Sequence, residues 1–258
     1  MGESLRVAMF TDSYPPILNG VAVSVDGLVR ELRRQGHRVD VYCPKFPGHR
    51  DTDPNVHRAF AIRSPWARDY PLAIPPYLRP LREFRRHEYD VVHSHTPFIL
   101  GMVALRWAQS HELPIVTTYH TLYDRYAHYL AAFPRRYARY RIAKHTHFYM
   151  NSVDRVITPT EAGERWLRRH AIATPISVIP TGVAAGAPHD RVESRRVLGL
   201  HPEERVLLYV GRLAKEKNLD VLMEAVARTM DGRRVRLVLV GDGPRRDHLL
   251  RRSRELGI

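Results

Sequence analysis

The sequence predicts an α/β protein built on parallel β-sheets, with two domains joined near residue 185. Short apolar runs alternate along the chain with longer amphipathic runs of helical spacing, which is the pattern of βαβ units. The alternation pauses at a stretch of small residues from 182 to 188 and then resumes. With 258 residues, 44% of them hydrophobic and 26% charged, the chain can bury a core, which excludes a wholly disordered protein.

The elements follow from local patterns. A first strand is expected at 5–10, before a turn-rich segment, and a helix at 21–34, where apolar residues recur at helical spacing and Gly36 is placed to end the helix. Five prolines between 64 and 80 predict a surface loop. Further apolar runs predict strands at 37–43, 90–93, 114–119, 153–158, 176–179, 206–210 and 235–240.

The small residues from 182 to 188 are the best candidate for a linker. We therefore expect a full-sized domain at 1–185 and, at 186–258, the first part of a second domain. The second part offers two strands and at most three helices, and a two-stranded parallel sheet buries too little surface to be stable alone. We expect the sequence to be the front portion of a longer protein, truncated at its C-terminus.

The chain is strongly basic, with 41 lysine and arginine residues against 27 acidic residues. This excess favours polyanionic partners, namely nucleic acid, acidic lipid surfaces or phosphate-bearing substrates. A coding bias toward arginine is an equal alternative for most surface positions, because only four of the 41 are lysine.

Several classes of protein are disfavoured. The longest apolar stretch, 97–108, is too short to cross a bilayer, and the N-terminus has no signal-peptide core. The single cysteine, Cys43, excludes an internal disulfide and a cysteine-based zinc site. We expect a soluble, cytoplasmic protein.

In open parallel sheets, ligands bind beyond the carboxyl ends of the strands. Gly20 stands where the first helix begins, and a glycine there lets a phosphate approach the helix N-terminus. The alternative is an ordinary turn glycine. His120 follows the strand at 114–119 and is suited to polar or acid–base work, or else to packing.

Two patterns suggest a metal site only superficially. His93 and His95 have H-x-H spacing, but no carboxylate or cysteine stands near them in sequence. Asp51 and Asp53 have D-x-D spacing, but they lie in a polar loop. We expect no metal site.

The second domain carries a basic loop after its first strand. Arg212, Lys215 and Lys217 lead into a helix, and such a loop can clamp a diphosphate, because arginine offers a planar fork and lysine a mobile charge. Gly241, Asp242 and Gly243 form a second tight turn at the same edge. With Gly20, these features predict a nucleotide held in a cleft between the domains.

No acidic residue occurs between 125 and 153, where basic and aromatic residues interleave. Each cation near an anionic membrane contributes about 1 kcal/mol to binding, so this segment is a candidate for membrane docking and acceptor binding. The alternative is a solvated basic helix, because the apolar and basic residues do not sort cleanly onto two faces. The candidate residues are Arg135, Arg136, Tyr137, Arg139, Tyr140, Arg141 and Lys144.

Six motifs, each weak alone, occur in a specific order: Tyr14-Pro15-Pro16…Asn19-Gly20-Val21, Val92-His93-Ser94-His95-Thr96-Pro97, Thr118-Tyr119-His120-Thr121, Ile179-Pro180-Thr181-Gly182-Val183, Gly211-Arg212-Leu213…Lys217-Asn218 and Gly241-Asp242-Gly243-Pro244. Together they resemble the family 4 glycosyltransferases, retaining enzymes of the GT-B fold with two Rossmann-like domains. The resemblance covers essentially the whole chain. The segment 119–129 is most similar to bacterial glucosyltransferases that act on diacylglycerol, whereas mannosyltransferases acting on phosphatidylinositol or other lipids share much of the rest.

The resemblance implies a role for each matched residue. Gly20 would approach the donor diphosphate, and Arg212 and Lys217 would neutralise the charge that develops on the departing nucleoside diphosphate. His120 would contact the donor sugar. No metal and no cofactor would be required, because cationic side chains hold the leaving group.

The sequence departs from the family pattern in two places. Ala184 stands where the family usually has aspartate. The family's pair of carboxylates, seven residues apart, which grips the donor sugar and ribose, belongs beyond residue 258. We therefore expect this chain alone to be inactive or nearly so.

The resemblance implies transfer of a hexose, glucose first, from a nucleotide sugar such as UDP-glucose to a lipid such as diacylglycerol, peripherally at the cytoplasmic membrane face. A mannosyltransferase is the nearest alternative, and a non-catalytic sugar-nucleotide-binding remnant is another. A nucleic-acid binder is a third, but no nucleic-acid-binding motif accompanies the charge, so we expect no nucleic acid partner.

Overall fold

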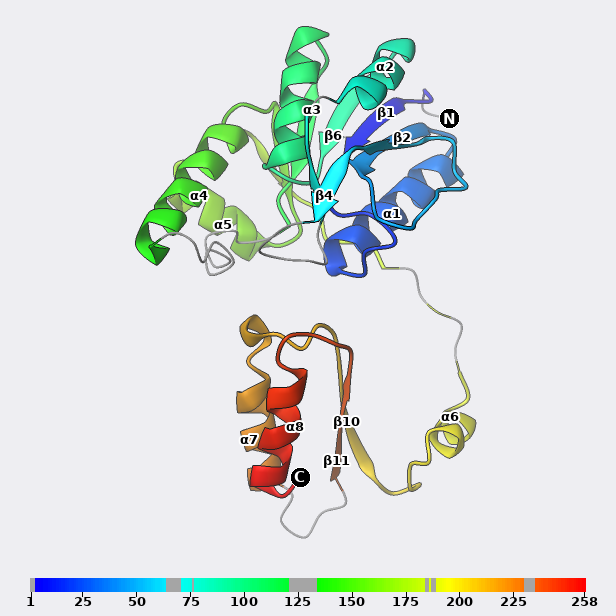
Figure 1. Ribbon diagram of the computed structural model, residues 1–258, viewed down its shortest axis with the longest axis vertical. Helices are drawn as coiled ribbons and strands as arrows, with labels where there is room; N and C mark the ends of the chain where they lie inside the picture. The colour runs from blue at the N-terminus through cyan, green and yellow to red at the C-terminus, as the bar shows by residue number, and fades with distance from the viewer. Residues whose placement is uncertain are drawn as a thin grey trace. The chain divides into compact units, whose positions relative to one another are not determined.

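A computed structural model of the chain describes residues 3–63, 71–75, 77–120, 134–183, 186, 189–229 and 235–258. The chain forms two compact units, Met1–Ala184 and Ala185–Ile258 (Figure 1).

The first unit is built on a seven-stranded sheet whose described neighbours all pair in parallel, in the order β3-β2-β1-β6-β7-β8-β9. This confirms the predicted α/β class. The strands are β1 (Arg6–Phe10), β2 (Arg38–Pro44), β3 (Val56–Ala59), β6 (Val91–Ser94), β7 (Ile115–Thr118), β8 (Arg155–Thr158) and β9 (Ile176–Val178).

Helices cover both faces of this sheet (Figure 1). Side chains alternate along β1, so Val7 and Met9 pack with α1, whereas Ala8 and Phe10 belong to a larger cluster that includes side chains of α2 and α3. Strands buried on both faces are mostly apolar, which is why the sequence shows them so clearly. The helices are α1 (Gly20–Arg34), α2 (Leu78–Arg86), α3 (Ile99–Ser110), α4 (Arg135–Met150) and α5 (Glu161–Arg169).

The first helix begins and ends where the sequence predicts. Asn19 caps its N-terminus, with the side-chain oxygen accepting a hydrogen bond of 2.8 Å from the backbone N–H of Ala22. Beyond its C-terminus Gly36 has φ +91°, a conformation that suits glycine. The cap places the first turn of α1 directly after the loop that follows β1.

Two features differ from the sequence prediction. β3 pairs with β2 at the edge of the sheet, and its partly exposed, polar sequence hides it from an apolar pattern. The predicted loop at 64–80 was partly wrong, because β5 (Pro71–Ala73) pairs antiparallel with β4 (Ala61–Arg63), and α2 begins at Leu78. Residues 64–70 and 76 lie outside the described part.

The second unit has two parallel strands and helices packed beside them. Leu213, Leu219, Met223 and Leu249 form its small core, while Leu208 and Val210 of β10 are 63% and 68% exposed. Its elements are α6 (Arg191–Val197), β10 (Arg205–Val210), the 3-10 helix η2 (Lys215–Lys217), α7 (Leu219–Thr229), β11 (Val235–Val240) and α8 (Arg246–Leu256).

Candidate functional site

Three histidines gather at the carboxyl ends of β6 and β7. His95 Nδ1 lies 2.9 Å from His120 Nε2, and the ring of His93 lies 4.3 Å from that of His95. His93 Nε2 is 2.8 Å from the hydroxyl of Thr118. The parallel pairing of β6 with β7 brings these side chains together. The histidines of the H-x-H motif (His93 and His95) and His120 of the Tyr-His-Thr motif are far apart in sequence, but they form one cluster.

Burial makes this cluster neutral. Desolvation lowers the pKa of His93 and of His120 to about 4, and it lowers the pKa of His95 well below the ordinary value. At neutral pH the three rings are therefore uncharged. His120, which lines the cavity described next, can act on a ligand through directed hydrogen bonds but not as a cation.

A cavity of about 330 Å³ opens beside this cluster, at the carboxyl ends of β7 and β8. His120 forms part of its wall, together with Thr158, Thr160 and Trp166. His120 is thus partly exposed to a concave space, as a ligand-contacting residue has to be. Residues 121–133, which contain the rest of the predicted Tyr-His-Thr-Leu-Tyr motif, lie outside the described part.

Asp12, which sequence reasoning missed, organises the neighbouring strand end. Its carboxylate accepts hydrogen bonds from the hydroxyl of Thr96, at 2.8 Å, and from the backbone N–H of Leu100 in the first turn of α3, at 3.2 Å. Burial raises the pKa of this carboxyl group, although both hydrogen bonds oppose the shift. Asp12 therefore ties the loop after β1, which leads to Gly20, to the start of α3.

Gly20 is the first residue of α1. A Cβ added there would meet no atom within 4 Å. The packing of the fold therefore does not require glycine at this position. A glycine here would, however, let a ligand approach the helix N-terminus closely.

Gly241 and Gly243, in contrast, have a structural reason. Both have positive φ, +142° and +156°, and a Cβ on either would overlap a backbone carbonyl oxygen, of Gly211 and of Leu213 respectively. Glycine is needed here because two loops of the second unit approach each other closely.

Backbone hydrogen bonds join these two loops. Gly211 N–H donates to Val240 O at 2.9 Å, Leu213 N–H donates to Asp242 O at 2.9 Å, and Arg245 N–H donates to Leu213 O at 3.0 Å. The basic loop and the Gly-Asp-Gly turn thus form one locked structure at the carboxyl ends of β10 and β11.

This locked structure holds the predicted cations on one short segment. Arg212 is partly buried, and its guanidinium forms a long ion pair of 4.0 Å with Glu216. Lys217 is exposed and ends η2. Gly20 belongs to the first unit, and Arg212 and Lys217 belong to the second, so their joint action on one diphosphate stays a prediction.

The basic segment forms helix α4. Ala138, Ile142 and Tyr149 are buried in the first unit, whereas Tyr140 and Phe148 are 60% and 54% exposed, so the exposed side carries apolar and basic residues together, as the sequence predicts. The exposed side also carries Arg136, Tyr137, Arg139, Arg141 and Lys144, and the helix begins at Arg135.

The D-x-D pair has structural partners. Asp51 accepts two hydrogen bonds from Arg58, at 2.7 and 2.9 Å, and Asp53 accepts one from Arg33 at 2.5 Å. Both carboxylates therefore hold loops in place.

No helix within the described residues combines the length and the apolar character needed to cross a bilayer.

Comparisons with known proteins agree with this architecture. The chain is 30% identical to the alpha-monoglucosyldiacylglycerol synthase of Streptococcus pneumoniae, over 98% of this chain and 59% of that protein. It is 32% identical to a GDP-mannose-dependent alpha-mannosyltransferase of Mycobacterium tuberculosis, over 93% of this chain and 63% of that protein. The chain thus spans about 60% of the length of these relatives.

Among solved structures, sucrose-phosphate synthase from Thermosynechococcus elongatus aligns with a TM-score of 0.76 at 20% identity, over 98% of this chain and 68% of that chain. This likeness supports the predicted GT-B fold. The family model for glycosyl transferases group 1 matches residues 190–258, and the model for glycosyltransferase family 4 matches residues 18–185, which is more than half of the chain. The chain therefore belongs to glycosyltransferase family 4.

Proposed function

We propose that the protein transfers a hexosyl group, glucose as first candidate, from a nucleoside diphosphate sugar to a lipid acceptor such as diacylglycerol, with retention at the anomeric carbon. Family membership supports the transfer of a sugar. The similarity to the Streptococcus pneumoniae enzyme supports glucose and diacylglycerol as the first pair to test.

The observation that carries the proposal is the locked basic loop of the second unit. Breaking the bond between sugar and diphosphate leaves negative charge on the departing phosphate, and cations fixed in advance stabilise that charge most effectively. The hydrogen bonds between the loop and the Gly-Asp-Gly turn fix the backbone that bears Arg212 and Lys217. With these cations, the proposed reaction requires no metal ion at the leaving group.

His120 supplies a polar contact of a different kind. Because its ring is uncharged at neutral pH, we assign it a hydrogen bond to a hydroxyl group of the donor sugar rather than a role in neutralising phosphate. Its position in the wall of the cavity at β7 and β8 suits that role.

The acceptor side rests on helix α4. Its exposed face interleaves arginines with Tyr140 and Phe148, a combination that suits the interface of an anionic membrane. We assign this face to peripheral docking on the cytoplasmic leaflet, where a lipid acceptor is available.

A mannosyltransferase is the second candidate, because the Mycobacterium tuberculosis relative is at least as similar in identity as the glucosyl one. A GDP-mannose donor with phosphatidylinositol as acceptor is the specific form to test.

The test is an assay of the protein extended to the full length of its relatives. UDP-glucose and GDP-mannose are each supplied with diacylglycerol or with phosphatidylinositol in vesicles, and the product is identified by mass spectrometry. Glucosyldiacylglycerol with α-configuration is the expected product. Mannosylated phosphatidylinositol would select the second candidate, and no glycolipid from either donor would refute both.

The same vesicles also address nucleic acid as an alternative partner. Affinities for anionic vesicles, duplex DNA and single strands are compared at two salt concentrations, since binding to nucleic acid falls steeply with salt. Tighter binding to nucleic acid than to vesicles would favour that alternative.

A further inference from the structure

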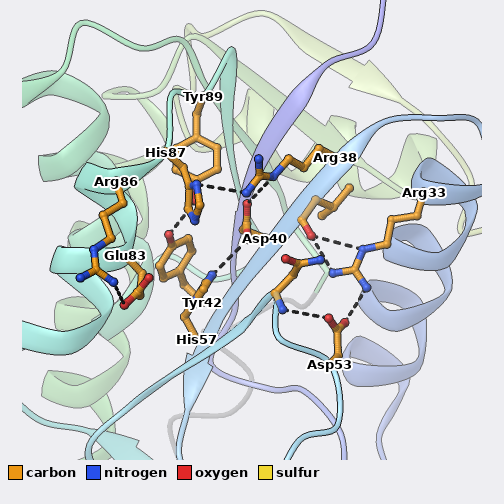
Figure 2. Close-up of polar contacts among 12 residues, drawn as sticks. Arg33, Arg38, Asp40, Tyr42, Asp53, His57, Glu83, Arg86, His87 and Tyr89 are labelled. Carbon is orange, nitrogen blue, oxygen red and sulfur yellow. Dashed lines mark hydrogen bonds and ion pairs between the residues drawn. The ribbon is translucent and has the colours of Figure 1, made fainter.

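Three potential metal ligands meet on one face of the first unit, away from the cavity beside His120. Asp40, His57 and His87 each offer one ligand atom, and these atoms all lie within 4.8 Å of one another. They come from β2, from β3 and from the residue that follows α2. Figure 2 shows the three side chains converging between β2 and the C-terminal end of α2. No regular spacing links them in sequence.

Asp40 is the unusual member. Its side chain has no solvent exposure, although it is an acidic residue within a strand. One carboxylate oxygen, Oδ1, lies 3.1 Å from His57 Nε2. The other, Oδ2, is buried and has no hydrogen-bond partner among the described residues. The charged neighbour of Oδ2 is Arg38, whose Nε lies 3.6 Å away, too far for a hydrogen bond, so this oxygen can still accept a closer positive partner.

One pair of the three ligands has a spacing that suits a small divalent cation. Two ligands on a tetrahedral zinc ion, each at 2.0 to 2.2 Å from the metal, lie about 3.3 Å apart. The observed 3.1 Å between His57 Nε2 and Asp40 Oδ1 is close to that separation. Two imidazoles with one carboxylate form a donor set that zinc accepts, with a water molecule as the fourth ligand.

Arg38 is the competitor for this position. Its Nη2 donates to His87 Nδ1 at 3.0 Å, and its Nε lies 3.6 Å from Asp40 Oδ2. The arginine side chain is 49% exposed, so it can turn toward solvent when a cation enters. Arg38 thus supplies one positive charge where a metal ion would supply two.

The surrounding aromatic groups hold the ligands in place. The ring of Tyr42 packs against that of His57, with 4.9 Å between the ring centroids and a tilt of 30° between the planes, and its hydroxyl lies 2.8 Å from that of Tyr89. Both tyrosines are buried. Such support fixes the orientation of metal ligands and strengthens binding.

We propose that Asp40, His57 and His87 form a binding site for a divalent transition-metal ion, zinc by preference, with Arg38 as the group that the ion displaces. Asp40 lies in the first half of β2, whereas His95 and His120 follow the carboxyl ends of β6 and β7. The site is therefore structural. It links β2, β3 and the end of α2, and it takes no part in the transfer of the sugar.

The test uses this chain after treatment with a chelator. Zinc is titrated by calorimetry, and cobalt by the visible absorption that tetrahedral cobalt acquires on binding nitrogen and oxygen ligands. One equivalent of each metal is expected to bind, with a rise in the melting temperature of the first unit. His87→Gln and His57→Gln are each expected to weaken zinc binding at least tenfold, whereas Arg38→Gln is expected to strengthen it severalfold.

His49→Gln is the matched control. His49 also lies near a carboxylate, with its Nε2 3.3 Å from Asp51 Oδ1. Among the described residues, however, these two do not belong to a group of three potential metal ligands. If the unaltered chain does not bind one equivalent of zinc, the proposal is overturned, even if the Arg38→Gln variant binds zinc. Full binding by folded His87→Gln, with folding checked by circular dichroism, also overturns it, because a partly exposed histidine can be replaced without disturbing the core.

Discussion

The imidazole rings of His95 and His120 are in contact, with His95 Nδ1 2.9 Å from His120 Nε2. His95 is 2% exposed, and its other nitrogen, Nε2, is buried with no hydrogen-bond partner among the described residues. This pairing determines where the protons lie. A proton on His95 Nε2 would be a buried N–H donor without an acceptor, which proteins avoid. We therefore expect His95 to carry its proton on Nδ1 and to donate it to His120 Nε2, and His120 to carry its own proton on Nδ1.

The first prediction concerns this tautomer. Nitrogen chemical shifts of the imidazole rings, measured by NMR at pH 7, should show His120 as the Nδ1–H form. His95→Asn keeps a side-chain N–H near the position of Nδ1 and should preserve that form, whereas His95→Leu should give a mixture of tautomers. A proton on His120 Nε2 in the unaltered chain would show that the pair is arranged the other way round.

The second prediction is a loss of stability in acid. The pKa values of His93 and His120 fall from 6.5 to about 4 on folding, so between these values the unfolded chain binds protons that the folded chain does not. The stability that these two neutral histidines contribute is fully present above about pH 6.5 and is lost as the pH falls toward 4. The expected loss is on the order of 3 kcal/mol for each histidine.

Urea unfolding followed by tryptophan fluorescence measures this effect, since all three tryptophans belong to the first unit. His93→Gln should reduce the dependence of stability on pH, whereas His147→Gln, at an exposed position on α4, should not. Equal stability at pH 7 and pH 4.5 would contradict the neutral cluster.

The third prediction compares two glycines. Gly241→Ala should destabilise the second unit by about 3 kcal/mol or more, because its Cβ would overlap the carbonyl oxygen of Gly211 and because φ is +142°. Gly20→Ala should change the stability of the first unit by no more than about 0.5 kcal/mol, since the space beside it is open. Amide hydrogen exchange reports the two units separately. Similar effects of the two substitutions would refute the packing argument.

The fourth prediction concerns the basic loop. In the protein at the full length of its relatives, Arg212→Ala and Lys217→Ala should each lower kcat by about 10²- to 10³-fold, because each removes a charge aimed at the leaving group. Lys215→Ala is the control: Lys215 lies on the same short 3-10 helix as Lys217 and is also exposed, and the variant should retain most of the activity. If all three variants behave alike, the loop has no specific role in the reaction.

The fifth prediction tests helix α4 as a membrane surface. Replacing Arg136 and Arg139 by glutamine should weaken binding to anionic vesicles about fivefold per residue, which corresponds to about 1 kcal/mol each. Vesicle co-sedimentation at two salt concentrations measures the change. Arg82→Gln with Arg85→Gln, exposed positions on α2, should leave binding unaltered. An equal loss in both double variants would point to general charge rather than to this helix.

Local sequence patterns determined the secondary structure where a strand is buried on both faces or where caps mark the ends of a helix. Strand β1 has apolar residues almost throughout, and α1 has both an Asn19 cap and a Gly36 stop. The polar edge strand β3 and the hairpin of β4 with β5 were missed, because a strand that is paired on one side or half exposed has no continuous apolar pattern. The motifs at Gly20, His120 and Arg212 could likewise be found by their positions after expected strands and by their resemblance to a family.

Tertiary structure alone decided which distant residues meet. Parallel pairing of β6 with β7 brought His95 to His120, and the packing of α2 beside β2 brought His87 to Asp40. It also shows which glycines the packing requires. Gly241 is required because the carbonyl group of Gly211 lies beside it, whereas no neighbouring atom requires glycine at position 20. Sequence spacing encodes the periodicity of single elements, but contacts, burial and the pKa shifts that follow from burial depend on how the elements pack together.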